Sequence, residues 1–352
     1  MSSHDEAVSR RSILLGGAAA LAAASMAGSA SAQAQPEGRF RIDTHHHIFP
    51  PKYMDEVRER IIAQAQGLPT DTMTGWTPQR SLEEMERSRV DKAIVSVAAP
   101  GIFFGDVEQG RRLARACVDY GADMIQKHPG RFGMFAPIPL PDVEGSLKAI
   151  EYALDVLKLD GVGILTSYGA RWPGDPAFAP VFDELNRRKA TVFVHPLAPD
   201  CCSNLQEGVS SALIEFPTDT TRCITSLLFS GTLTRCQDIN FIFAQGGGTL
   251  PFLAGRLNAA MFFTPGLPEK LPKGILHELK RLNYDVVSMA NPISVAALLQ
   301  LVPSQQLFFG SDFPYLSGKV VADGLQKISL LSPADLTKIE RENALRLLKK
   351  AV

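Results

Sequence analysis

The sequence predicts an α/β fold, a TIM-type (β/α)8 barrel, on two observations. Short runs rich in β-branched and aromatic residues recur after residue 39, and helical patterns separate them. Most of these runs are apolar throughout rather than alternating, as expected for a parallel sheet that is covered on both faces. The expected strands are Phe40–His45, Ala93–Val97, Arg131–Pro137, Gly161–Leu165, Thr191–His195, Phe241–Gln245, Asn283–Val287 and Leu307–Gly310.

Helical spacing supports the same architecture. Val107–Lys127 and Leu147–Leu157 carry apolar residues at the i, i+3, i+4 positions of amphipathic helices. Ser332–Leu348 is expected to be the closing helix, with Ser332 as N-cap and Asp335 at the third helical position. A doubly wound open sheet is the alternative, but no G-x-G-x-x-G follows the first strand. Eight repeated units therefore favour the barrel.

Composition limits the classes of function. The chain has 352 residues, is 45% apolar and 21% charged, and carries a net charge of −1. Without a dense stripe of Lys and Arg, we expect a small-molecule partner and no nucleic acid. The cysteines form neither a disulfide framework nor a C-x-x-C pair; they are Cys117, Cys201, Cys202, Cys223 and Cys236.

Residues 1–32 are predicted to be a twin-arginine signal peptide. Arg10-Arg11 precedes an Ala/Gly-rich apolar run that closes on Ala30-Ser31-Ala32, a small-x-small cleavage site. The apolar run is too short and too rich in Ala and Gly to span a membrane well. We therefore expect residues 33–352 to form a single barrel domain in a bacterial periplasm, with no membrane span after signal removal.

The strand ends carry candidate metal ligands. The first strand ends in "RIDTHHHIFP", and residues two apart in a strand face the same way. His45 and His47 are therefore expected to point into the barrel mouth, and His46 away from it. His195 ends the fifth strand and Asp312 follows the eighth. Together they make a set of three nitrogens and one oxygen with open positions, typical of a catalytic metal site.

Two segments are longer than ordinary loops. Residues 49–78 follow the first strand, and residues 196–217 follow the fifth. Both leave the carboxyl ends of strands, where a barrel builds its active site. We expect each to act as a lid or as a wall of the substrate pocket.

Four segments, in this order, resemble motifs of the amidohydrolase superfamily: "DTHHHIFP", "VFVHP", "FIFAQGGGTLPFLAGR" and "LFFGSDFPY". They most resemble the branch that contains aminocarboxymuconate-semialdehyde, γ-resorcylate and 6-methylsalicylate decarboxylases, and the likeness runs from about residue 39 to the C-terminus. The resemblance implies a metal-dependent amidohydrolase-type barrel and a carbon–carbon lyase (carboxy-lyase). It implies that one divalent metal, zinc first and manganese second, is bound by His45, His47, His195 and Asp312.

The fourth strand implies a site with one metal. Relatives with two metals usually bridge them with a carboxylated Lys at the end of that strand. This chain reads "GVGILTSYG" there and has no Lys. A mononuclear site is therefore expected.

The resemblance also implies substrate-binding residues. Arg256 in "FLAGR" matches an arginine that some relatives present to the neighbouring subunit's site, which implies a homodimer; an ordinary helix-surface Arg is the alternative. A second arginine that dicarboxylate-binding relatives carry before Trp76 is missing from "TDTMTGW". That departure favours a substrate with one carboxylate. Trp76 and Phe104 are candidate aromatic walls, with packing as the alternative role of each.

One position departs from the family pattern. The residue before the glycines of "FIFAQGGG" is usually a histidine in the family and is Gln245 here. Because a neutral amide does not titrate near pH 7, Gln245 is expected to orient groups and Asp312 to transfer the proton. The predicted function is metal-dependent, non-oxidative decarboxylation of a hydroxybenzoate or salicylate-like acid. The alternatives are a hydrolase or hydratase of a lactone or unsaturated acid, and a catalytically impaired periplasmic metal-binding homologue.

Overall fold

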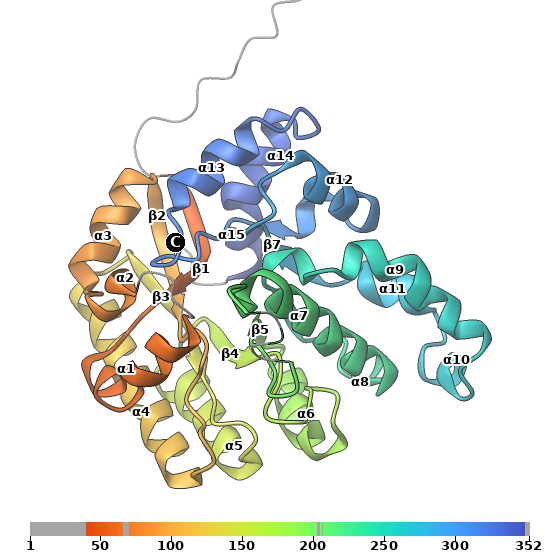
Figure 1. The fold of residues 1–352 in the computed structure, drawn as a ribbon, viewed down its shortest axis with the longest axis horizontal. Helices are drawn as coiled ribbons and strands as arrows, with labels where there is room; N and C mark the ends of the chain where they lie inside the picture. Colours follow the sequence, from red (N-terminus) through yellow and green to blue (C-terminus); the bar gives the residue numbers. More distant parts are fainter. Residues whose placement is uncertain (1–39, 66–69, 203–204, 206, 349–352) are drawn as a thin grey trace, which may run out of the picture. The chain divides into compact units, whose positions relative to one another are not determined.

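Eight parallel strands form one sheet in chain order. The computed structural model describes residues 40–65, 70–202, 205 and 207–348. Each strand pairs with the next from β1 to β8 (Figure 1). The strands are β1 Arg41–His47, β2 Val90–Ser96, β3 Phe132–Pro137, β4 Gly161–Leu165, β5 Thr191–His195, β6 Asn240–Phe243, β7 Asn283–Asp285 and β8 Leu307–Phe308. All eight expected strands are confirmed, with bounds that shift by a few residues.

Backbone hydrogen bonds just beyond β8 bring the sheet round to β1. The Thr44 amide donates to the Phe309 carbonyl at 2.9 Å, and the Asp312 amide donates to the His45 carbonyl at 2.7 Å. The His47 amide donates to the Phe313 carbonyl at 2.8 Å. The segment after β8 therefore runs beside β1, and the predicted barrel is confirmed.

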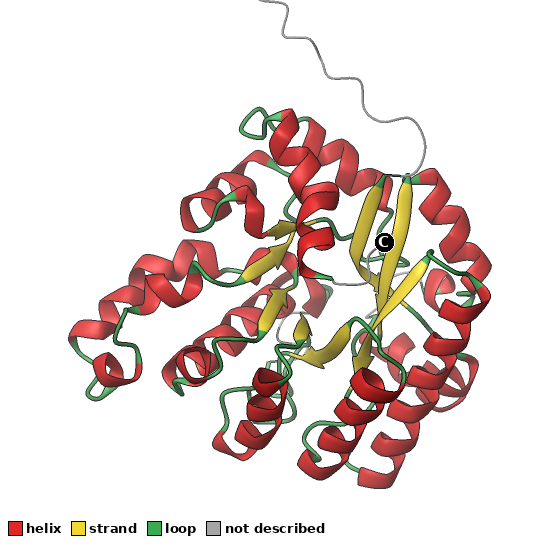
Figure 2. Ribbon diagram, turned by 180° about the vertical axis from the view of Figure 1, so that it is seen from behind, coloured by secondary structure: helices red, strands yellow, loops and turns green. Residues whose placement is uncertain are grey.

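Helices surround the strands, as Figures 1 and 2 show. They are α1 Pro51–Gln64, α2 Asp71–Thr74, α3 Pro78–Arg87, α4 Val107–Lys127, α5 Val143–Glu151, α6 Ala179–Arg187, α7 Ser211–Phe229, α8 Thr232–Arg235, α9 Leu250–Ala259, α10 Leu267–Lys270, α11 Ile275–Leu279, α12 Pro292–Leu301, α13 Gly318–Gln326, α14 Pro333–Thr337 and α15 Asn343–Leu347. The helix expected at Val107–Lys127 is confirmed with the same bounds. The one expected at Leu147–Leu157 begins earlier, as α5, and continues in a π-helical turn, Tyr152–Val156.

Large side chains fill the barrel interior and the C-terminal helix closes its amino end. Phe135 and Phe193 stack with their ring centroids 5.5 Å apart, in a cluster that includes Ala344 of α15. Ser332 and Asp335 form the expected capping box at the start of α14. The helix then passes through a π-helical turn, Lys338–Glu342, into α15. With α15 packed across the amino end, the open end described below is the carboxyl end of the strands, where the metal ligands lie.

The two long segments lie at that open end. Residues 49–78 contain α1 and α2, and residues 196–217 lead into α7. Both contribute lining residues to the cavities described below. Their expected role as walls agrees with this placement.

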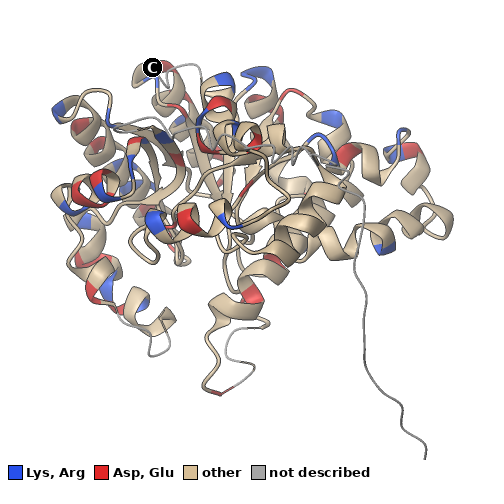
Figure 3. Cartoon of the chain, turned by 90° about the horizontal axis from the view of Figure 1, so that it is seen from above, with Lys and Arg blue, Asp and Glu red and all other residues tan. Residues whose placement is uncertain are grey.

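Charge and hydropathy add two observations. Acidic and basic residues are interspersed along the helices in the view of Figure 3. Among the described residues, no helix is both long and apolar enough to cross a membrane. The expected signal peptide, residues 1–32, lies outside the described residues.

Candidate metal centre

Four side chains from three strand ends converge at the carboxyl end of the barrel. The ligand atoms of His45, His47, His195 and Asp312 all lie within 4.8 Å of one another. The Nε2 atoms of His45 and His47 are 3.1 Å apart, and Asp312 Oδ1 lies 3.2 and 3.0 Å from them. These imidazole nitrogens and this carboxylate oxygen converge on one point. Their unshared electron pairs could together bind a divalent cation. The predicted metal site is confirmed as a group.

The alternation of β1 separates the neighbouring histidine from this group. His46 Nδ1 lies 3.0 Å from Asp43 Oδ2, and its Nε2 lies 3.0 Å from the Ser81 hydroxyl of α3. The ring also packs on Phe313, with centroids 4.9 Å apart. His46 therefore faces the surrounding helices while His45 and His47 face the centre, as the period of two predicts.

A partner occupies the second ring nitrogen of each ligand histidine. His45 Nδ1 lies 2.7 Å from Asp285 Oδ2, and His47 Nδ1 lies 3.2 Å from the Ser96 hydroxyl. His195 Nδ1 donates to the Pro196 carbonyl at 2.8 Å. When Nδ1 carries the proton, the unshared pair of Nε2 points at the centre. These contacts set the tautomer that a metal ligand needs.

Asp285 is a residue of the site that sequence reasoning missed. It ends β7 and is fully buried. While Oδ2 holds His45, Oδ1 accepts from the amides of Gln245 at 2.8 Å and Val287 at 3.0 Å. The available signal was a carboxylate inside the apolar run "NYDVV", which needs a partner when buried.

Buried charges set the protonation states of the ligands. Burial, the largest influence, raises the pKa of Asp312, but His45 and His47 outweigh it and lower that pKa far below its usual range. Burial, the largest influence, lowers the pKa values of His47 and His195 and so favours the neutral form of each ring. Burial also lowers the pKa of His45, but Asp285 and Asp312 outweigh it and raise that pKa to about 10. A bound metal would replace the proton that His45 otherwise carries between the Asp285 and Asp312 carboxylates.

The segment after β6 has an unusual backbone. Gln245 has a φ of 54°, and each of the three glycines that follow also has a positive φ. A Cβ on Gly248 would collide with the Pro217 carbonyl oxygen. The glycines therefore permit a tight turn, and Gln245 adopts a left-handed conformation that costs a non-glycine residue free energy.

A cavity of about 350 Å³ opens beside the ligands. His195, Gln245 and Asp312 line one side of it, and Met73, Phe216 and Tyr315 are among the residues of the other walls. Gln245 thus shares a cavity with two of the metal ligands. Tyr315, three residues after Asp312, is a lining residue that sequence reasoning missed.

The other predicted binding residues lie outside this cavity. Trp76 is buried, its indole N–H donates to the Ser81 hydroxyl at 2.9 Å, and its ring packs near Tyr120. Phe104 lines a second cavity, and Arg256 is exposed on α9. Within one protomer, the structure therefore brings together the ligands and Gln245 but none of these three residues.

The end of β4 agrees with a single metal. Leu165 is the residue of β4 that pairs with His195 of β5. An apolar side chain at this position offers no ligand atom to a metal. Among the described residues, the four ligands above form the one group that could hold an ion.

We predict that replacing Asp285 with Asn weakens metal binding about 10- to 100-fold, because the amide cannot hold the His45 ring as the carboxylate does. Isothermal titration of the metal-free protein with Zn²⁺ or Mn²⁺ measures this change. Asp219→Asn is the matched control, since Asp219 is equally buried but accepts from Thr166, Ser167 and Trp172 rather than from a ligand. Equal losses in both variants would contradict a specific role for Asp285.

Comparison with known proteins agrees with the fold and the site. The model of the family described as amidohydrolase matches residues 42–350. The chain is 35% identical to the decarboxylase macB of Penicillium terrestre, across 78% of this chain and 84% of that protein. It is 31% identical to the 6-methylsalicylic acid decarboxylase of Penicillium expansum, across 78% and 85%.

Among solved structures, the fold resembles a 5-carboxyvanillate decarboxylase of Novosphingobium aromaticivorans in complex with manganese. The TM-score is 0.79 at 22% identity, and the match covers 89% of this chain and 96% of the other. A likeness at this level of identity concerns the fold. The matched length, the four ligands at their strand ends and the barrel together identify this chain as a member of the amidohydrolase family.

Proposed function

We propose that this protein is a metal-dependent, non-oxidative decarboxylase of a small aromatic acid of the hydroxybenzoate or salicylate type. The observation that carries the proposal is the complete ligand set, which opens onto a cavity of about 350 Å³. That volume lies at the small end of the range for ligand pockets, about 300 to 1,000 Å³, and suits a single ring. The names of the relatives, which are decarboxylases, support the same reaction.

The ligand set favours zinc, with manganese as the second choice. Three imidazoles and one carboxylate suit Zn²⁺, while the manganese in the carboxyvanillate decarboxylase supports Mn²⁺. When bound, the metal would polarise the oxygens of the substrate's carboxylate and phenol groups. Metal analysis of the purified protein decides between the two ions.

Asp312 is positioned to transfer the proton. Its Oδ1 faces the histidines, and no hydrogen bond to Oδ2 is formed within the described residues, so Oδ2 remains available to a substrate in the cavity. Because the pKa of Asp312 lies far below its usual range, the side chain rests as a carboxylate, the form that accepts a proton before passing it on. The substrate's phenol supplies the proton, Asp312 passes it to the ring carbon, and the bond to the carboxylate then breaks to release carbon dioxide.

Gln245 holds the substrate rather than exchanging protons with it. Its backbone N–H is bound by Asp285, so the side chain projects from a fixed point beside His195 and Asp312. An amide both donates and accepts hydrogen bonds without titrating. We therefore assign Gln245 to orienting the phenol oxygen or a water molecule near Asp312.

We predict that Asp312→Asn lowers decarboxylation by about 10³-fold or more, because it removes a metal ligand's charge and the proton donor together. Gln245→His should change the rate less than about tenfold, since histidine also tolerates a positive φ. Carbon dioxide release from a panel of substituted salicylates measures both. If the wild type is inert on every acid and Gln245→His is active, Gln245 marks a lost activity and the proposal is wrong.

We propose further that the protein is a homodimer in which α9 contributes to the interface. Phe252 and Phe262 are each 88% exposed, and Phe263 is 71% exposed, on and just after the helix that carries Arg256. Several large apolar side chains this exposed along one segment are typical of surfaces that a partner covers. A second copy would cover these rings and receive Arg256 near its own cavity, where the guanidinium would bind the substrate's carboxylate.

We predict that Phe262→Asp yields a monomer, because a buried carboxylate would lack a partner in the interface. Arg256→Ala should remain dimeric and raise KM about 10- to 100-fold, the cost of a lost charged hydrogen bond. Light scattering after gel filtration and steady-state kinetics measure the two effects. Val156→Asp is the control, since Val156 is 63% exposed but follows α5 rather than α9. A monomeric wild type with full activity would refute the assignment.

For residues 1–32 we propose export to the periplasm through the twin-arginine route. Replacing both Arg10 and Arg11 with Lys should leave the full-length chain in the cytoplasm, because the paired arginines are the part of the signal that the export system recognises. Fractionation of a bacterial host that has this export system, with mass spectrometry of the N-terminus, measures both location and cleavage. An uncleaved wild-type chain in the cytoplasm would show that this proposal is wrong.

A further inference from the structure

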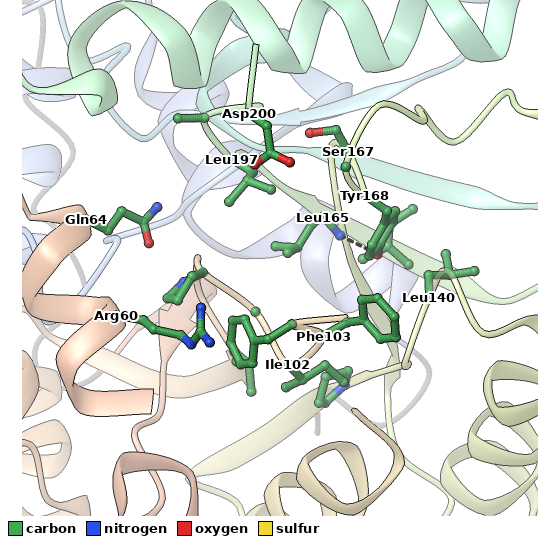
Figure 4. Close-up of a pocket in the computed structure, with 18 of the residues that line it drawn as sticks. Arg60, Gln64, Ile102, Phe103, Leu140, Leu165, Ser167, Tyr168, Leu197 and Asp200 are labelled. Carbon is green, nitrogen blue, oxygen red and sulfur yellow. Dashed lines mark hydrogen bonds between the residues drawn. The ribbon is translucent and has the colours of Figure 1, made fainter. Parts of the chain in front are cut away.

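A second cavity, of about 670 Å³, adjoins the metal cavity. We call it the side chamber and define it by Gln64, Ile102, Phe103, Leu140, Leu165 and Leu197, which Figure 4 shows around it. Gln64 lines both cavities. At a second place, neighbouring residues line different cavities: Ala99 lines the metal cavity and Pro100 lines the side chamber. The two cavities are therefore neighbours at the open end of the barrel.

Glycines line the hollow, including one within β4 and one in the loop after β2. Gly163 of β4 pairs with Phe193, whose ring points into the barrel, so a side chain at position 163 would point inward as well. Gly101 has a φ of 81°, and a Cβ there would press against Leu165. The Tyr53 hydroxyl donates a hydrogen bond to the Gly101 carbonyl at 2.9 Å, which fixes the position of this turn. The Gly101 side of the chamber is therefore fixed by a packing contact and a hydrogen bond.

The wall of the side chamber is more apolar than polar, and the Tyr168 hydroxyl on it is already bound. The Tyr168 hydroxyl accepts from the Leu165 amide at 2.8 Å, which leaves the ring as a wall, and Figure 4 marks this bond. Arg60 lies over the Phe104 ring at 4.4 Å, and both Arg60 and Asp200 are exposed. The charges therefore lie at the rim, while leucine, isoleucine and phenylalanine side chains form the wall.

We infer that the side chamber holds an alkyl or aryl substituent of the aromatic acid, so that the preferred substrate is larger than an unsubstituted hydroxybenzoate. This inference rests on the proposed function. The metal cavity suits one ring, and the side chamber begins at Gln64, beside it. Apolar groups gain free energy when such a wall removes them from water, and each buried methylene strengthens binding by about fourfold.

Matched pairs of acids test the inference. The probes are 2-hydroxybenzoates with a methyl or a pentyl group at position 5 or 6, titrated into the metal-loaded protein by calorimetry and assayed for carbon dioxide release. At one ring position, the pentyl acid should bind at least about tenfold more tightly than its methyl partner. If the methyl and pentyl acids bind with equal affinity at both ring positions, the side chamber holds only solvent and the inference is wrong.

Filling the chamber provides the second arm. Ala63→Trp on α1 and Ala198→Phe after β5 each add bulk at a lining position, from different segments of the wall. Each variant should bind the pentyl and methyl acids with about equal affinity. Ile62→Trp is the matched control, because Ile62 is 47% exposed and lines neither cavity, and it should keep the wild-type preference. A preference that survives both filled variants would contradict the inference.

Calorimetry separates this inference from the proposed function. If the metal-loaded protein binds the pentyl acid preferentially but releases no carbon dioxide from any probe, the side chamber is supported and decarboxylation is refuted. If carbon dioxide is released with no preference for the pentyl acid, decarboxylation stands and the side chamber's role is refuted. Each outcome thus decides one claim independently of the other.

Discussion

The hydrogen bond between His45 Nδ1 and Asp285 Oδ2 is the contact on which the site depends. It is 2.7 Å long, both side chains are fully buried, and it joins the first strand to the seventh. Through its other oxygen, Asp285 also binds the backbone of Gln245. One carboxylate therefore aims a metal ligand and anchors the residue that departs from the family pattern. In a buried environment this bond is stronger than in water, and losing one partner would leave the other charge unpaired.

The hydrogen bonds around the site limit which of its groups can do acid–base chemistry. The Nδ1 atoms of His47 and His195 are also engaged, and the metal requires their Nε2 atoms. Gln245 does not titrate, and burial raises the pKa of Tyr315 above its usual range, so on the proposed mechanism Asp312 is the acid–base group at the cavity. Its depressed pKa is a consequence of the same cluster, because the neighbouring histidines favour the carboxylate. On this proposal, metal binding and proton transfer would use the two oxygens of one side chain.

On the two proposals above, the metal cavity would carry out the reaction and the side chamber would select the substrate. Side chains that bind the metal or face it line the smaller cavity, whereas aliphatic and aromatic groups line the side chamber. Gln64 of α1 belongs to both, so the long segment after β1 shapes the passage from one to the other. The exposed phenylalanines near Arg256 lie on a different part of the barrel, on and after α9. Selection of the ring's substituent and recognition of its carboxylate would therefore use different segments of the chain.

The sequence by itself determined what depends on short spacing. Strand apolarity predicted eight strands, the period of two separated His46 from His45 and His47, and the Ser332 capping box marked a helix start. Only the tertiary structure decided which distant groups meet: Asp285 lies 240 residues from His45, and Trp76 packs on Ser81 rather than in the metal cavity. The physical reason is that local periodicity fixes where a side chain points, whereas its partner depends on how strands and helices far apart in the chain pack together.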